Sequence, residues 1–189
     1  LERIAPASVL SEVLEDRRRL EELAGVPVIG MSYPFGTSNP QVVELLRSCG
    51  IVYSRTTASH GRFSLPDEFL LWNPTCHHSH DLDAKAEAFL NLPPNRELSL
   101  LYVWGHAYEF DREEPASSWK LIEAFCEKMS GREDIWYATN LEIFEYVTAL
   151  RSLVTGVDGK LLRNRSALDL WVQADGKAVK IPAGSSVTL

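Results

Sequence analysis

The sequence of 189 residues predicts an α/β fold. A mainly parallel sheet with crossover helices, open or closed into a barrel, should be followed by a small antiparallel β appendage. Three observations predict this. Short apolar segments alternate with helical periodicities as far as about Leu153. The apolar run 101–104 stops at Gly105, as a buried strand does at its carboxyl end. Two Asp-Gly pairs, at 158–159 and 175–176, separate short alternating runs and are typical of hairpin turns.

Helix signals are clear at both ends of the first two predicted helices. Apolar residues recur at helical spacing over Pro6–Ala24, and Gly25 is placed to end that helix as a C-cap. Asn39 is a typical N-cap, Pro40 takes the first helical position, and Gly50 follows the last turn. The other elements predicted in this half are strands over Val28–Met31, Ile51–Tyr53 and Phe69–Trp72, and a helix over Asp81–Leu90.

The second half repeats the alternation of strand and helix. Ser118 and Gly131 frame one helix, and Thr139 with Glu142 forms a capping box for another that ends near Leu150. Strands are predicted over Leu98–Trp104 and Ile135–Tyr137. We therefore expect residues 1–153 to form the barrel portion, and residues 154–189 to form a short β-hairpin appendage packed on the barrel.

Composition excludes several classes of protein. With 45% hydrophobic and 24% charged residues, the chain is typical of a globular protein with one good core. A net charge of −7 argues against sequence-independent binding to nucleic acid, which requires a basic face. No apolar run approaches the ~20 residues that span a bilayer. The cysteines Cys49, Cys76 and Cys126 are widely spaced, which predicts buried free thiols in a reducing, cytoplasmic compartment.

The candidate catalytic residues follow predicted strands. His106 comes directly after Gly105, and Glu109 and Asp111 lie just beyond it, so its imidazole could donate a proton to a leaving group. The turn around Phe35 could aim a backbone N–H at a developing oxyanion, or it could be an ordinary connection. Arg55 could clamp a carboxylate or orient a catalytic group, or it could be a solvated surface residue.

A second cluster contains three histidines within four residues, His77, His78 and His80, followed by Asp81 and Asp83. Imidazoles and carboxylates are natural zinc ligands, but neighbours on one segment cannot usually all face one ion. The cluster therefore predicts either a metal site or a polar pocket wall with His77 or His78 pointing inward. The aromatic residues near these sites could stack on a sugar ring or could be core; they are Tyr33, Trp72, Trp104 and Tyr108.

Four motifs together resemble the polysaccharide deacetylases, metal-dependent carbohydrate esterases on a distorted (β/α) barrel. They are Gly30-Met-Ser-Tyr-Pro-Phe-Gly36, Arg55-Thr-Thr57, Trp104-Gly-His-Ala-Tyr-Glu-Phe110 and Asp134-Ile-Trp-Tyr-Ala-Thr139. The resemblance implies a partial or distorted (β/α) barrel and a hydrolase that removes acetyl groups from N- or O-acetylated sugars. It also implies a divalent metal, commonly zinc, as Lewis acid.

The resemblance assigns roles to individual residues. It makes His106 the general acid, the Phe35 backbone N–H the oxyanion donor, and Arg55 the residue that orients a catalytic aspartate. Pro34 and Tyr33 would shape the pocket floor. The residues expected to contact substrate are Tyr33, Pro34, Trp72, His77, His78, Trp104 and Tyr108.

The family's metal-binding motifs, Thr-Phe-Asp-Asp-Gly and His-x-x-x-His, do not occur in this sequence. We therefore expect the base and the metal ligands to lie upstream of Leu1, and no deacetylase activity from these residues alone. Missing barrel strands would leave an exposed sheet edge that favours self-association. Two alternatives remain: a carbohydrate-binding relative without catalysis, and a different metal hydrolase that uses His77, His78 and His80 with Asp81 or Asp83.

Overall fold

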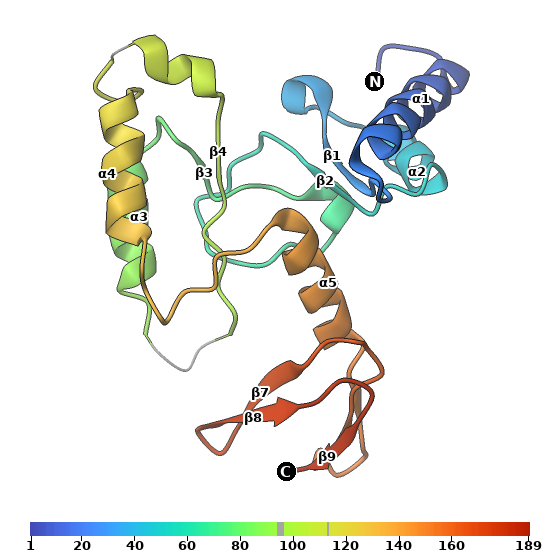
Figure 1. Cartoon of the computed structure of the whole chain (residues 1–189), viewed down its shortest axis with the longest axis vertical. Helices are drawn as coiled ribbons and strands as arrows, with labels where there is room; N and C mark the ends of the chain where they lie inside the picture. Colours follow the sequence, from blue (N-terminus) through green and yellow to red (C-terminus); the bar gives the residue numbers. More distant parts are fainter. Residues whose placement is uncertain (94–96, 113) are drawn as a thin grey trace. The chain divides into compact units, whose positions relative to one another are not determined.

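The computed structural model describes residues 1–93, 97–112 and 114–189 and shows a mixed α/β fold (Figure 1). The chain forms two compact units, Leu1–Asp134 and Ile135–Leu189. None of the small sheets in the described ranges is closed into a barrel.

The helices are α1 Pro6–Ala24, α2 Pro40–Ser48, α3 Leu82–Leu90, α4 Trp119–Met129 and α5 Asn140–Arg151, with 3-10 helices at Pro34–Gly36, Phe69–Leu71 and Ala107–Arg112. The strands are β1 Gly30–Ser32, β2 Tyr53–Arg55, β3 Cys76–His77, β4 Val103–Trp104, β5 Val154–Thr155, β6 Leu161–Arg163, β7 Leu170–Ala174, β8 Lys177–Ile181 and β9 Ser186–Thr188.

The strands of the first unit are parallel, and each lies beside the next in chain order. Strand β1 pairs with β2, and β3 pairs with β4. The segment that leads into β3 joins the two pairs, because Trp72 forms a parallel bridge to Arg55 and its N–H donates to the Ser54 carbonyl at 3.0 Å. Parallel strands in this order direct all their carboxyl ends to one edge, where sites in α/β proteins assemble.

The predicted helix boundaries are confirmed where capping residues mark them. Helix α1 spans Pro6–Ala24 and ends at Gly25, whose φ of 69° is the left-handed conformation that glycine adopts without strain. Helix α2 begins after Asn39, whose side chain accepts a hydrogen bond from the Val42 N–H at 2.9 Å. The two helices contribute to one buried cluster with β1 and β2; its members include Val9, Val13, Val42, Leu46 and Ile51.

Two predicted strands are wrong. The segment Phe69–Trp72 forms a 3-10 helix over Phe69–Leu71, because the Glu68 carboxylate accepts the Leu70 N–H at 2.9 Å and starts a turn. Residues 135–137 form no strand in the described structure. Trp136 and Tyr137 are more than half exposed, so the apolar side chains of this segment do not mark a buried strand.

The second unit consists of α5 and the antiparallel strands β5–β9. The predicted capping box is present, with the Thr139 N–H donating to Glu142 at 2.7 Å and the Thr139 side chain accepting from the Glu142 N–H. The Asp-Gly pair at 175–176 turns the β7–β8 hairpin with both residues at positive φ. The division between units falls at residue 134 and not at 153, because Ala149 of α5 packs with Leu162 and Leu170 in one buried cluster.

The three cysteines are free, as their spacing predicted, but only Cys49 and Cys76 are buried; Cys126 is exposed on α4, so the prediction that it is buried was wrong. Among the described residues, no helix combines the length and apolar character needed to cross a membrane.

Candidate functional site

The candidate site lies where β3 and β4 end. His77 on β3 is opposite Trp104 on β4, and the His78 N–H donates to the Trp104 carbonyl at 2.9 Å. After Gly105 the chain turns into the 3-10 helix Ala107–Arg112, in which the Glu109 N–H donates to the His106 carbonyl at 3.1 Å. This tight turn brings Glu109 back over the residues at the strand ends. Three histidines and one carboxylate therefore meet at the carboxyl edge of the sheet.

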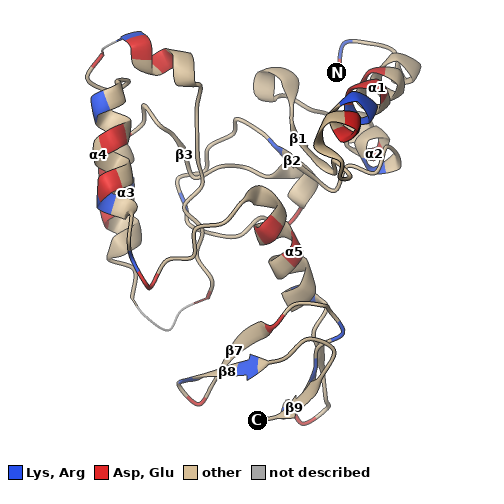
Figure 2. Ribbon diagram, in the orientation of Figure 1, with Lys and Arg blue, Asp and Glu red and all other residues tan. Residues whose placement is uncertain are grey.

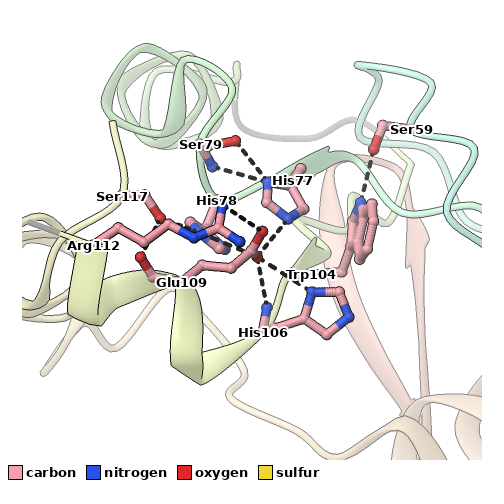
Figure 3. Close-up of polar contacts among 9 residues, drawn as sticks. All are labelled: Ser59, His77, His78, Ser79, Trp104, His106, Glu109, Arg112 and Ser117. Carbon is pink, nitrogen blue, oxygen red and sulfur yellow. Dashed lines mark hydrogen bonds and ion pairs between the residues drawn. The ribbon is translucent and has the colours of Figure 1, made fainter. Parts of the chain in front are cut away.

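Glu109 is the centre of this cluster, and Figure 3 shows the three histidines arranged around its carboxylate. Its Oε2 atom lies 3.1 Å from His77 Nε2, 3.7 Å from His78 Nε2 and 3.3 Å from His106 Nδ1. The same oxygen accepts the His106 backbone N–H at 3.1 Å. His77 and His78 are buried, whereas the His106 side chain is 51% exposed. One histidine of the cluster is therefore open to solvent, and two are enclosed.

The environment keeps the two buried imidazoles neutral. Burial lowers the pKa of His77, and the neighbouring His78 lowers it further, although Glu109 opposes both effects. Burial also lowers the pKa of His78, against the attraction of Glu109. For Glu109, burial raises the pKa, but hydrogen bonds from His106 and attraction to His77 and His78 outweigh it and lower the pKa overall. Neutral imidazoles beside a carboxylate are the protonation states that metal binding requires.

Two serines hold the buried histidine rings. The Ser79 N–H donates to His77 Nδ1 at 3.2 Å, so His77 carries its proton on Nε2 and donates it to Glu109. The Ser79 hydroxyl lies 2.7 Å from the same Nδ1. It could accept a hydrogen bond from Nδ1 if the ring proton moved there and Nε2 bound another ligand. The Ser117 hydroxyl lies 3.0 Å from His78 Nε2 and donates to the Glu109 carbonyl. The Ser79 contact is to the nitrogen opposite Nε2 and is of the kind that orients a ligand histidine, whereas the Ser117 hydroxyl occupies the Nε2 atom of His78, where a metal would replace it.

His77, His78 and Glu109 could hold a metal ion, because one ligand atom from each lies within 4.8 Å of the others. The other residues of the predicted alternative, His80, Asp81 and Asp83, are not members of this group. His80 and Asp81 are exposed, and Asp81 lies in the left-handed region before α3. Asp83 instead forms an ion pair with Lys128 of α4. Two histidines and a glutamate are a ligand set typical of catalytic zinc, which leaves a position open for substrate or water.

A cavity of about 430 Å³ adjoins the cluster. The Arg55 guanidinium lies over the Trp104 ring at 5.1 Å, and the Trp104 indole N–H donates to the Ser59 hydroxyl at 3.0 Å. Apolar side chains from α4 and the 3-10 helix complete the wall. The lining residues are Arg55, His78, Tyr102, Val103, Trp104, Gly105, His106, Ala107, Phe110, Ile122 and Phe125.

Several residues predicted for the site lie outside this cavity. Trp72 is 1% exposed and packs among aromatic rings of the core, so it presents no face to a sugar. Tyr33 is also buried, and its hydroxyl donates to the Leu70 carbonyl at 2.7 Å. Tyr108 is exposed and stacks on His106 with ring centroids 5.2 Å apart, at the rim of the cluster. Pro34 is exposed and does not line the cavity.

Phe35 adopts the left-handed conformation with φ of 59°, uncommon for a residue with a side chain. Within the described part of the chain, its backbone N–H has no hydrogen-bond partner. Its turn follows β1, so it lies on the same edge as His106, which follows β4. Three strand spacings of about 4.8 Å would separate the two by roughly 14 Å along a flat sheet. The oxyanion role of Phe35 therefore stays a prediction.

The sequence did not identify Glu109 as the residue that joins the histidine segments. Its position three residues after His106 was the available signal, because that spacing returns a side chain over the start of a tight helical turn. Nothing local connects Glu109 with His77 and His78, more than thirty positions earlier. Ser117 was equally hidden, since only the tertiary fold brings it to His78.

We expect Gly105→Ala to disturb the cluster. A Cβ atom at this position would lie 1.8 Å from His78 Nδ1, so the His78 ring would have to move. The expected result is a loss of about 1–3 kcal/mol in unfolding free energy and a fall of about 10–100-fold in metal affinity. Urea denaturation and equilibrium dialysis measure the two. Gly131→Ala is the control, because nothing crowds that site and only its left-handed backbone is strained. Unchanged metal affinity in Gly105→Ala would contradict the prediction.

Comparison of the chain with protein-family models, with curated proteins and with solved structures gives no match.

Proposed function

We propose that this chain is a metal-dependent hydrolase of acetylated sugars, of the polysaccharide deacetylase type. The convergence of His77, His78 and His106 on Glu109 beside a 430 Å³ cavity carries the proposal. Parallel strands that follow one another in chain order support a partial (β/α) barrel. The motif resemblance supplies the acetylated sugar as substrate.

The metal in this proposal is zinc, with ligands within the chain. His77 and His78 would each present Nε2, and Glu109 would present a carboxylate oxygen. When the ring proton of His77 moves from Nε2 to Nδ1, Nε2 can bind the metal and the Nδ1–H can donate a hydrogen bond to the Ser79 hydroxyl. A zinc ion bound here would supply Lewis-acid polarisation of an acyl carbonyl.

His106 would supply the proton for the leaving amine or alkoxide. Because a carboxylate only accepts hydrogen bonds, its contact with Glu109 places a proton on His106 Nδ1. In the described structure Nε2 has no partner, and the residue lines the cavity. The protonated imidazole can therefore donate from Nε2 while Glu109 stabilises its charge, as general acid catalysis requires.

Metal binding and acetate release test the proposal together. After removal of metal with a chelator, the purified chain should bind one zinc ion in equilibrium dialysis. The same protein should release acetate from N-acetylglucosamine oligomers or from O-acetylated xylose oligomers when zinc is restored. Zinc binding without acetate release from either substrate would contradict a hydrolase and favour a carbohydrate-binding protein. Absence of zinc binding would contradict the metal site.

A further inference from the structure

The described lining of the cavity beside the metal cluster carries one permanently cationic side chain, that of Arg55. The chain carries a net charge of −7, yet the lining residues within the described part of the chain include Arg55, His78 and His106 and no aspartate or glutamate. Figure 2 shows acidic positions on helices α1, α3 and α5, whereas β3 is drawn in the colour of uncharged residues. A cavity lined by cationic and imidazole groups favours anionic ligands.

Arg55 is the charged side chain that offers the most hydrogen-bond donors to a ligand in this cavity. Its Nη1 donates to the Thr56 carbonyl at 3.2 Å, and its guanidinium lies over the Trp104 ring. Among the described residues, no carboxylate lies within ion-pair distance of it. A guanidinium has five N–H donors in a planar fork, so most of its donors are free for a ligand.

The stacking on Trp104 prepares Arg55 for recognition. Trp104 is itself fixed by β4 pairing and by its indole hydrogen bond to Ser59. A guanidinium held over a fixed ring loses little further side-chain entropy when it binds, and its fork matches a carboxylate in a bidentate arrangement. The opposite wall, from Phe110, Ile122 and Phe125, is apolar and suits a sugar face or an acetyl methyl group.

We propose that the acetylated sugar bound in this cavity carries a carboxylate group, which Arg55 holds. The proposal rests on the proposed function for the acetylated sugar, whereas the carboxylate follows from Arg55, Trp104 and the cavity. It also differs from the role that the resemblance assigns to Arg55, the orientation of a catalytic aspartate.

A matched substrate pair tests the carboxylate. The pair is an O-acetylated methyl glucuronoside and the corresponding O-acetylated methyl glucoside, which replaces the carboxylate with a hydroxymethyl group. With zinc-loaded protein, kcat/KM should be about 10–100-fold higher for the acidic substrate, the size of a charge-assisted contact. Arg55→Gln should abolish this ratio, and Arg55→Lys should retain part of it. Exposed Arg62 lies outside the cavity lining, so Arg62→Gln should leave the ratio unchanged.

A binding measurement separates this inference from the proposed function. Glucuronate should bind to the same protein in calorimetry, glucose should bind more weakly, and Arg55→Gln should lose the difference. That result without any acetate release would support the carboxylate site and contradict the hydrolase. Equal kcat/KM values for both substrates would overturn the carboxylate proposal and leave the hydrolase standing. The carboxylate proposal would also be overturned if inorganic phosphate or sulfate bound more tightly than glucuronate. It would be overturned as well if a carboxylate of the protein itself paired with Arg55 and prevented glucuronate from binding.

Discussion

His106→Ala is expected to lower kcat for acetate release by roughly 10²–10⁴-fold, the usual contribution of general acid–base catalysis. The physical reason is the position of the imidazole: Glu109 fixes Nδ1, and Nε2 is left for the leaving group. Zinc affinity should change little, because the metal ligands would come from His77, His78 and Glu109. Steady-state kinetics and equilibrium dialysis on the same preparation measure both quantities.

The control for this substitution is His60→Ala. His60 accepts the Arg62 N–H within its own loop and does not line the cavity, so its loss should leave kcat unchanged. If His106→Ala kept full turnover, His106 would not be the acid. If it lost zinc as well as turnover, its role would be in holding Glu109 and not in proton transfer.

Glu109→Gln is expected to weaken zinc binding by more than about 100-fold, a larger effect than the loss of an outer-shell contact. The substitution keeps the shape of the side chain but removes the negative charge that His77, His78 and His106 surround. The amide oxygen can still accept the His106 N–H, so the turn should persist. Zinc titration monitored by calorimetry measures the affinity, and circular dichroism verifies the fold.

Glu123→Gln is the matched control, because this substitution changes the net charge by the same amount as Glu109→Gln. Glu123 is an exposed residue of α4 and lies outside the cluster. Its zinc affinity should equal that of the unmodified protein. Cobalt gives a second readout: its visible absorption should appear with the unmodified chain and be absent in Glu109→Gln. Zinc affinity unaltered by Glu109→Gln would exclude Glu109 as a ligand and would contradict the proposed metal site.

The sequence predicted the helices well because their ends are marked by local chemistry. Gly25 at positive φ, the Asn39 side chain on the Val42 N–H, and the Thr139 capping box act within a few residues of the chain. The Asp175 hairpin turn is local in the same way. These features require no knowledge of the rest of the fold.

The strands were harder to predict, since a strand exists only where a partner supplies hydrogen bonds. The apolar run before Gly105 is long, yet only Val103 and Trp104 pair in β4. Trp72 looked like a strand residue available for sugar stacking, and the fold instead buries it among Tyr53, Phe69 and Tyr102. Burial of an aromatic ring depends on the surfaces packed around it, which the local sequence does not specify.

The sequence by itself determined the α/β class, the capped helices and the C-terminal hairpins, because each depends on neighbouring residues. It also identified His77, His78 and His106 as candidate site residues from their place in local segments. Tertiary structure alone decided that Glu109 joins these histidines and that Arg55 lies over Trp104. The first arrangement arises from parallel pairing of β3 with β4, more than twenty-five positions apart, and the second also needs the parallel bridge between Arg55 and Trp72. Side chains at strand ends meet only after such pairing has formed.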